Sequence, residues 1–105
     1  MRIIKGVLRE ELENSLKMKK GYEQALEDLP RGCLVQKEIR GHKYYYLAVR
    51  EDSKVKYVYK GKVSDDYIKK YAEAKKMRAK YRNLLSQAKK QIKFLRKTLR
   101  GKESV

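Results

Sequence analysis

The strongest constraint on the fold is an apolar repeat in the C-terminal third of the chain. Over residues 71–99, apolar side chains recur in alternating steps of three and four residues, and Arg78 fills the one slot that is not apolar. This heptad pattern is typical of helices that pack against one another. With Ser64 as a candidate N-cap, the pattern predicts one long helix over residues 64–100, ending at Gly101.

The same segment is strongly basic. Residues 74–102 contain twelve lysines and arginines and no acid. The basic side chains keep a heptad register of their own, so the charge forms a stripe along the predicted helix, suited to lie along a polyanion. The nucleic-acid-binding residues predicted from this stripe are Lys75, Lys76, Arg82, Lys89, Lys90, Lys93, Arg96 and Lys97.

The charge is distributed unevenly along the chain. Residues 1–30 carry six basic and six acidic side chains, residues 31–63 carry nine and three, and residues 64–105 carry fourteen and four. The resulting net charge of +16 indicates attraction to phosphate, either in nucleic acid or on an anionic membrane. The alternative is that the charge only keeps the protein in solution.

Length and composition limit the core and the compartment. A chain of 105 residues with one phenylalanine and no tryptophan predicts a single domain, residues 1–105, that is elongated or shares its core. The lone Cys33 cannot form an intrachain disulfide, and no apolar run is long enough for a signal peptide or a membrane span. We therefore expect a cytoplasmic protein that does not cross a membrane.

A shorter helix is predicted at the other end of the chain, over residues 8–29. Gly21 follows two lysines and predicts a kink or a break, and Pro30 ends the segment. Ser15 and Lys19 interrupt the apolar face in its middle. The apolar positions of that face are Leu8, Leu12, Tyr22, Leu26 and Leu29.

Between the two helices, residues 32–60 have the composition of β-strands. Three runs rich in β-branched and aromatic residues, 34–39, 43–49 and 55–59, are separated by short polar turns at 40–42 and 51–54. Turns of this length predict a three-stranded antiparallel meander. The predicted fold is α+β: a coiled-coil-like hairpin of two helices, with a small antiparallel sheet between them in sequence.

The unequal helix lengths predict self-association. The long helix should measure about 55 Å and the first helix about 33 Å, so an antiparallel pair that starts at the sheet would run out of first helix near Ser86. The seam beyond that point then needs a partner, and a second copy of the chain is the simplest one. The residues predicted to form this homodimer contact are Leu85, Ala88, Ile92, Leu95 and Leu99.

Five of the nine tyrosines fall in the second and third predicted strands. Because side chains alternate, Tyr45, Leu47 and Val49 share the more apolar face, which we expect to be the core, and Tyr44 and Tyr46 face outward. Outward rings among basic side chains suit base stacking with phosphate binding. The alternative is that the rings stabilise an exposed sheet by cross-strand pairing. The binding residues predicted for the sheet are Arg40, Lys43, Tyr44, Tyr46, Arg50, Lys56 and Lys60.

No pattern for catalysis or metal binding is present in the sequence. One histidine, His42, and one cysteine cannot complete a zinc site. The segment 61–64 lacks the upstream glycine of a phosphate-binding loop, and no nucleophile, base and orienting group can be proposed. We expect no enzyme activity, no catalytic residue, no metal and no cofactor.

Three short motifs carry a resemblance to a known family: Leu-Pro-Arg-Gly at 29–32, Tyr-Tyr-Tyr-Leu at 44–47 and Lys-Gly-Lys at 60–62. Over residues 22–100 the chain resembles a family of small uncharacterised prokaryotic proteins with a long basic C-terminal helix. It departs from that family at Cys33, where serine is usual, and at residues 52–53, where two glycines are usual. The resemblance implies this architecture and does not determine a function, since the family has no established activity.

More remotely, the tyrosine-rich strand, the basic turn and the Lys-Gly-Lys ending are similar to the three-stranded arm-site DNA-binding modules of phage-type integrases. The leading hypothesis is therefore a non-enzymatic nucleic-acid-binding protein of a prokaryote or mobile element, with DNA favoured over RNA. One alternative is a protein-interaction module, antitoxin-like or an inhibitor, that docks on an acidic partner. The other alternative is a structural dimer.

Overall fold

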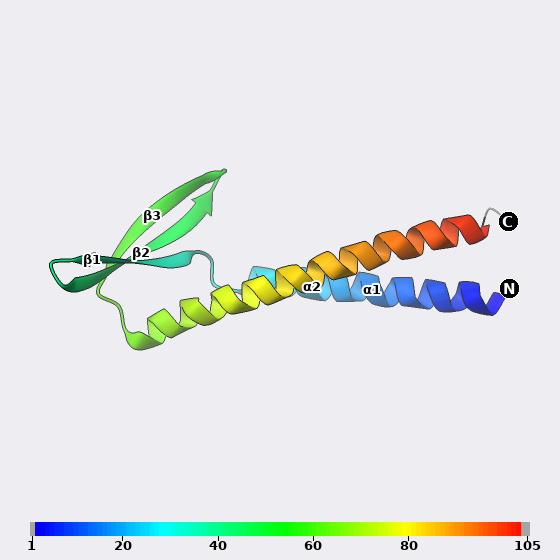
Figure 1. Ribbon diagram of the computed structural model, residues 1–105, viewed down its shortest axis with the longest axis horizontal. Coiled ribbons are helices and arrows are strands. Elements are labelled where there is room, and N and C mark those ends of the chain that lie inside the picture. The colour runs from blue at the N-terminus through cyan, green and yellow to red at the C-terminus, as the bar shows by residue number, and fades with distance from the viewer. Residues whose placement is uncertain (1, 104–105) are drawn as a thin grey trace. The chain divides into compact units, whose positions relative to one another are not determined.

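The computed structural model describes residues 2–103 of the chain, and the side chains of residues 4–101. Two helices flank a three-stranded antiparallel sheet in sequence, which confirms the predicted α+β class (Figure 1). The chain divides into two compact units: unit 1 joins the first helix to the second helix from Ala79 onward, and unit 2 is Leu29–Arg78. The elements are α1 (Arg2–Asp28), β1 (Cys33–Ile39), β2 (His42–Glu51), β3 (Lys54–Gly61) and α2 (Asp65–Glu103).

Helix α1 is longer than the predicted segment 8–29 and continues without a break. The predicted break at Gly21 is wrong, and Gly6 also lies inside the helix. A Cβ atom at either glycine would meet nothing within 4 Å, so each costs about 1 kcal/mol of helix propensity and no packing. Burial of the apolar face on both sides of Gly21 outweighs that cost. The helix ends two residues before Pro30, as the sequence predicts.

Helix α2 begins where the sequence places it. The Ser64 hydroxyl accepts a hydrogen bond from the backbone N–H of Tyr67 at 3.2 Å, and Asp65 and Asp66 lie in the first turn. The helix runs to Glu103, so the predicted end at Gly101 is wrong. A glycine inside the last turn of a long helix removes too little free energy to end it.

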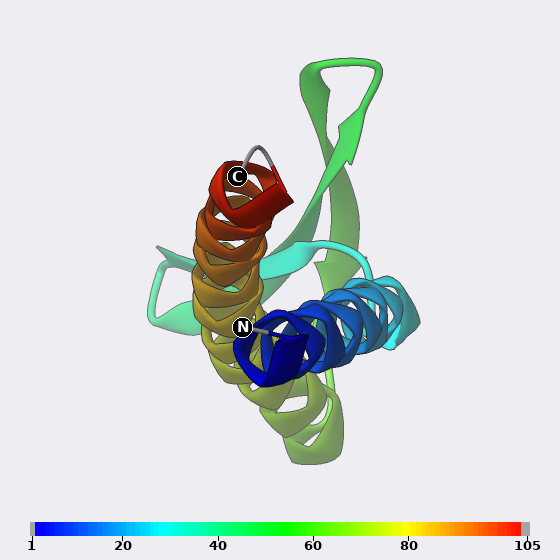
Figure 2. The same cartoon turned by 90° about the vertical axis from the view of Figure 1, so that its right-hand side faces the viewer.

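In unit 1, α1 and the distal part of α2 lie side by side and antiparallel (Figures 1 and 2). The rings of Tyr22 and Tyr81 are 6.3 Å apart between centroids. One heptad away on each helix from that pair are Ser15 and Ala88, and both are buried. Small side chains at opposed seam positions allow two helices to approach closely, which accounts for a serine in the middle of an apolar face.

The predicted gap in the helix seam is not present. Ala88, Ile92, Leu95 and Leu99 are between 4% and 6% exposed in the single chain, and Leu85 is half-buried. The expectation that a second copy must cover these residues is therefore wrong. That expectation assumed that the helix pair starts at the sheet end of both helices. The first fourteen residues of α2 instead belong to unit 2. Helix α1, about 40 Å long, therefore pairs with residues 79–103, which are about 38 Å long.

The sheet of unit 2 has the strand order β1-β2-β3, with both pairs antiparallel. The turns are the two-residue segments 40–41 and 52–53, and all four residues have positive φ angles of 48–78°. Such angles are typical of the type I′ turns whose twist matches that of a hairpin. The predicted turns are therefore too long: His42, Glu51 and Lys54 pair within the sheet.

Unit 2 has a small core around Leu47, which is buried on the face predicted to be the core. Gly32 packs against it with φ at 100°: a Cβ atom there would lie 3.0 Å from both the Ala48 carbonyl oxygen and the Leu47 Cδ1 atom. The guanidinium of Arg78 donates hydrogen bonds to the Pro30 oxygen at 2.8 Å and to the Gly32 oxygen at 3.4 Å. These bonds explain why an arginine occupies an apolar slot of the heptad pattern.

Two tyrosines pair near the start of α2, one turn apart. The rings of Tyr67 and Tyr71 are 4.9 Å apart between centroids. A hydrogen bond between their side chains, with a contribution from burial, raises the pKa of Tyr71 above its ordinary value of 10.0. The pair therefore favours a neutral phenol at Tyr71 in the folded chain.

Candidate nucleic-acid interface

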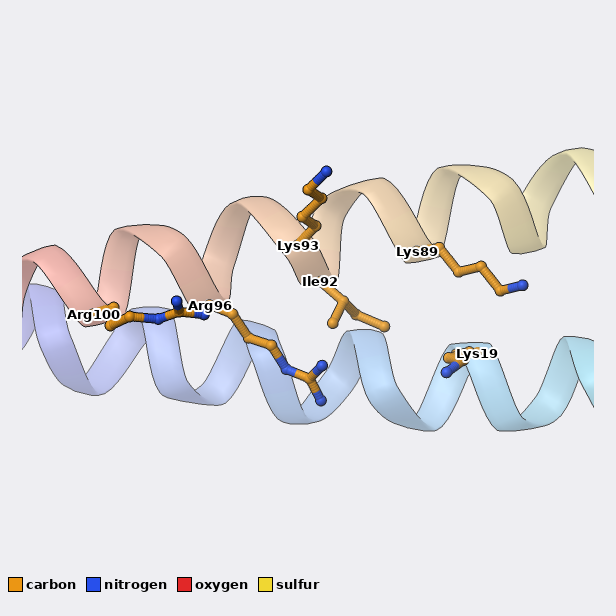
Figure 3. A pocket seen from close by; sticks show the side chains of 6 residues that line it. All are labelled: Lys19, Lys89, Ile92, Lys93, Arg96 and Arg100. Atoms are coloured by element: carbon orange, nitrogen blue, oxygen red, sulfur yellow. The ribbon is translucent and has the colours of Figure 1, made fainter.

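In unit 1, positively charged side chains surround a cavity of about 340 Å³ (Figure 3). Five of its six lining side chains are cationic and none is acidic. One comes from α1 and the others come from successive turns of α2. The lining residues, which we call the basic groove, are Lys19, Lys89, Ile92, Lys93, Arg96 and Arg100.

Lys19 is a residue of the groove that sequence analysis did not select. It occupies a seam position of α1, four residues after the buried Ser15 and three before Tyr22. Figure 3 shows Ile92 pointing toward α1 and the Arg96 guanidinium extending over α1, whereas the Lys93 ammonium points away. The sequence signal is the interruption of the apolar face at Lys19, which by itself indicates only a weak point of the helix.

Four of the five cations of the groove have no acidic partner. Lys19, Lys89, Lys93 and Arg96 form no ion pair with any residue that the structure describes. The acids Glu23 and Glu27 of α1 line a different cavity, together with Lys20, Gln24 and Leu26. Since Lys19, Lys89 and Arg96 lie at one cavity without a counter-charge among the described residues, the groove has a positive potential that attracts anions.

A second cavity, of about 430 Å³, extends the positive surface along α2. It shares Lys89 and Lys93 with the basic groove and again has no acidic lining residue. Together the two cavities follow α2 from Arg82 to Arg100, a rise of about 27 Å. The residues that line the second cavity are Arg82, Leu85, Ser86, Lys89, Lys90 and Lys93.

The other predicted stripe residues lie outside these two cavities. Lys97 is exposed in unit 1 and lines neither of them. Lys75 and Lys76 are exposed on the part of α2 that belongs to unit 2. The structure therefore brings together Arg82, Lys89, Lys90, Lys93 and Arg96 of the predicted stripe.

In unit 2, one face of the sheet carries a cluster of tyrosine rings. The centroids of Tyr46 and Tyr59 are 5.3 Å apart, and those of Tyr44 and Tyr59 are 6.5 Å apart. The Lys37 ammonium lies 5.7 Å from the centroid of the Tyr46 ring, within the range of a cation–π interaction. We call this surface, with the neighbouring Tyr57, the tyrosine face.

The rings of the tyrosine face differ in accessibility. Tyr44 and Tyr46 are half-buried, whereas Tyr57 is 66% exposed and Tyr59 is 58% exposed. Tyr59 contacts both half-buried rings, but Tyr57 makes no ring contact within the described residues. Tyr57 is therefore the ring whose surface is most available to a ligand.

The strand register corrects part of the predicted sheet site. Lys56 pairs with Val49, so it lies with Lys43 on the Leu47 face, opposite the tyrosine face. Lys56 also forms an ion pair with Glu51 at 3.1 Å. The prediction that both lysines lie beside the outward rings is wrong. Lys43 precedes Tyr44 in β2, so alternation alone places it on the opposite face, whereas the face of Lys56 depends on the cross-strand register, which the prediction left open.

The other predicted sheet residues have different places. Arg50 shares the tyrosine face with Tyr44 and Tyr46, because side chains alternate along β2. Arg40 is in the first hairpin turn, and Lys60 is the extra residue of a β-bulge in β3. The face therefore keeps Tyr44, Tyr46 and Arg50 of the predicted set.

Sequence analysis also missed three residues of the tyrosine face, Lys37, Tyr57 and Tyr59. The signal was present: Tyr57 and Tyr59 alternate along β3 and so share a face. Tyr59 pairs with Tyr46, and Lys37 pairs with Tyr44. Counting outward from the two short turns would have placed all three residues on the face of these rings.

Comparisons with family models, curated proteins and solved structures give no match to this chain. Within residues 2–103, no helix combines the length and apolar character needed to cross a membrane. The described residues also contain no group of three or more histidines, cysteines and acids placed to hold a metal ion. The functional argument therefore depends on the basic groove, its extension along α2 and the tyrosine face.

Proposed function

We propose that this protein is a non-enzymatic nucleic-acid-binding protein that holds phosphate groups along the Arg82–Arg100 surface of α2. The observation that carries the proposal is the pair of adjoining cavities that share Lys89 and Lys93 and have no acidic lining residue. A basic protein whose charge served only solubility would have no need to exclude acids from the 29 consecutive residues 74–102 that provide this surface. Acids do occur in unit 1, and two of them, Glu23 and Glu27, line a separate cavity on α1.

The physical basis is neutralisation of phosphates. A helix face about 27 Å long with a cation on nearly every turn can meet several phosphates of one backbone, and each contact releases condensed counterions. Such contacts give affinity and position but carry no sequence information. Binding through this surface should therefore be strong at low salt and weakly dependent on sequence.

The tyrosine face supports a second mode of contact. Exposed aromatic rings on a sheet stack on unpaired bases, and nearby cations bind the connecting phosphates. Tyr57 and Tyr59 offer the exposed rings, and Lys37 and Arg50 lie on the same face. We propose that this face binds unpaired bases while the α2 surface binds phosphates.

The preference for DNA, the prokaryotic or mobile-element origin and the membership of the small prokaryotic family rest on the motif resemblances alone, and they stay predictions. The lone Cys33 thiol supports our further proposal that the protein works in a reducing cytoplasm. A homodimer is no longer part of the proposal, since the seam residues that motivated it are buried within one chain.

The first experiment measures duplex DNA binding as a function of salt for a double variant, Lys89→Gln with Lys93→Gln. If both lysines contact phosphate, the slope of log affinity against log salt falls by about 1.8, since each lost contact contributes about 0.9. The matched control is Lys17→Gln with Lys20→Gln, which removes the same charge from α1 of the same unit. The control slope should stay at the value of the unmodified protein.

Equal changes in the two double variants would mean that only net charge matters, and the proposed surface would be wrong. Duplex, single-stranded DNA and structured RNA are compared in the same assay, together with polyglutamate. Binding to polyglutamate as tight as binding to nucleic acid would refute the proposal and favour the acidic protein partner.

A second experiment tests the tyrosine face with Tyr57→Ala. Because Tyr57 makes no ring contact among the described residues, its removal should leave the sheet intact. We expect a loss of about 1–3 kcal/mol in single-strand affinity and no change for duplex. The control is Val55→Ala, which removes an exposed aliphatic side chain two residues away on the same strand face. Unchanged single-strand affinity in Tyr57→Ala would remove this face from the binding surface.

A further inference from the structure

The seam between the two helices of unit 1 contains a charged side chain that the fold does not need. Apart from Lys5 near the start of the helix, the other α1 positions in the same register are apolar, aromatic or small, whereas Lys19 places a half-buried lysine between Ser15 and Tyr22. A leucine there would bury apolar surface against α2. A lysine must instead turn its ammonium out toward solvent, along the helix surface.

The ammonium turns out into a region that is already positive. Lys89, Lys93, Arg96 and Arg100 line the same cavity, and Lys19 forms neither a hydrogen bond nor an ion pair with any described residue. Lys19, Lys89 and Arg96 would repel one another less if they lay on different faces, whereas the Lys93 ammonium already points away. The proximity of these three cations therefore costs stability in the free protein, and an anion in the cavity would recover it.

We infer that the basic groove is a binding site for a ligand with adjacent phosphate groups, and that Lys19 couples occupancy of the site to the stability of the helix pair. Phosphate oxygens accept charge-assisted hydrogen bonds from ammonium groups and paired bonds from a guanidinium such as that of Arg96. Ile92 gives the cavity an apolar floor, which reduces screening of these contacts by salt.

The number of cations and the open form of the cavity favour ligands with more than one phosphate group. The cavity, of about 340 Å³, is a groove open to solvent, so it does not limit the ligand to a single phosphate. A chain of adjacent phosphates also brings enough negative charge to meet several cations at once. The phosphates can belong to a nucleic-acid strand or to a free oligophosphate, and the inference rests on the proposed function only in the first case.

The test compares Lys19→Leu with Lys17→Leu in the full chain. Lys17 is exposed on the same helix, two residues from Lys19, and lines none of the cavities described above, so both variants make the same chemical change. Thermal unfolding and calorimetric titration are measured with sodium tripolyphosphate, with a short oligothymidylate, and with sodium chloride at matched ionic strength.

We expect tripolyphosphate to raise the Tm of the unmodified protein above that in matched sodium chloride. Without ligand, Lys19→Leu should unfold roughly 5 °C higher than the unmodified protein, because an apolar side chain replaces a charge in the seam. The same variant should bind tripolyphosphate about tenfold to a hundredfold more weakly, as expected for one lost charged hydrogen bond. Lys17→Leu should match the unmodified protein in affinity, and Lys19→Arg should retain most of the binding.

Two results would overturn the inference. Equal loss of tripolyphosphate affinity in both leucine variants would show diffuse attraction in place of a site, and unchanged affinity in Lys19→Leu would show that Lys19 plays no part. The proposed function fails separately. A protein that binds tripolyphosphate through Lys19 but binds no nucleic acid keeps this site and loses the proposed function, whereas binding to oligothymidylate alone, without dependence on Lys19, does the reverse.

Discussion

Replacing Arg78 with methionine should destabilise the protein more than the loss of any surface charge of α2. Methionine keeps much of the length and the helix propensity of arginine but removes the guanidinium. That group donates to the Pro30 oxygen at 2.8 Å and to the Gly32 oxygen at 3.4 Å, both part-buried. The substitution therefore releases the connection into β1 from the helix that holds it.

The magnitude follows from the two distances. A hydrogen bond from a charged donor contributes about 1.5–3 kcal/mol, and the bond at 2.8 Å should be near the middle of that range. The bond at 3.4 Å adds little, because it is at the long end of the accepted geometry. Water can reach both carbonyls after the substitution, so we expect a loss of about 2 kcal/mol and a fall in Tm of roughly 10 °C for a chain of this size.

The assay is thermal unfolding followed by circular dichroism at fixed ionic strength. Arg82→Met is the control, since Arg82 is exposed one turn further along α2 and loses the same charge. In a protein of net charge +16, losing one positive charge slightly relieves self-repulsion, so the control should not fall. If both variants unfold at the same temperature, the Arg78 contacts do not stabilise the fold, and the explanation of its place in the heptad pattern is wrong.

Three further predictions concern a turn, the seam and a titration. Ser53 has φ at 68°, so Ser53→Gly should stabilise the protein by about 1 kcal/mol, measured by urea unfolding; a loss of stability would contradict the strain assigned to this turn. Leu95→Ala should lower the free energy of unfolding by about 3 kcal/mol and leave the molecular mass in light scattering unchanged, while Phe94→Ala, at a 65% exposed position, should lower it little. If Leu95→Ala instead halved the mass, the unmodified protein would be a dimer held by this seam. Because the pKa of Tyr71 is raised in the folded state, its contribution to stability is fully present below pH 10 and is lost as the pH rises through the folded-state pKa. Tyr71→Phe should therefore lose less stability than the unmodified protein over this pH range. Parallel curves of stability against pH would show that the raised pKa of Tyr71 does not contribute.

The parts of the fold predicted from sequence are those that local pattern determines. Alternation and two short polar turns specified the meander, and Ser64 with the following acids specified the start of α2. The helix ends failed because glycine is a weak signal: a Cβ atom added at Gly21 or Gly101 would have no neighbour within 4 Å, so nothing but a small propensity opposes the helix there. At both glycines, burial of the neighbouring apolar side chains is enough to continue the helix.

The errors at the candidate site arose where two segments must be placed against each other. Charge and periodicity identified the basic surface of α2, but Lys19 joins it from α1, and its position depends on the alignment of the two helices. In the same way, Lys56 left the predicted sheet site and Tyr59 joined it because of the cross-strand register. The pattern within one helix or strand predicts which side chains share a face, whereas the pairing of two segments decides which of these faces lie together.

The exceptions to the heptad pattern separate structure from function in this chain. Arg78 interrupts the apolar repeat of α2 and donates hydrogen bonds to two backbone carbonyls. Ser15 interrupts the apolar face of α1 one heptad from Tyr22, at the position that corresponds to the buried Ala88 of α2. Both exceptions have a structural reason. Lys5 and Lys19 both interrupt the α1 register with no partner among the described residues, but Lys19 also lines the basic groove, together with four other cations. Since a sequence departs from local consistency mainly where function requires it, Lys19 is the position at which a ligand should supply what the fold leaves out.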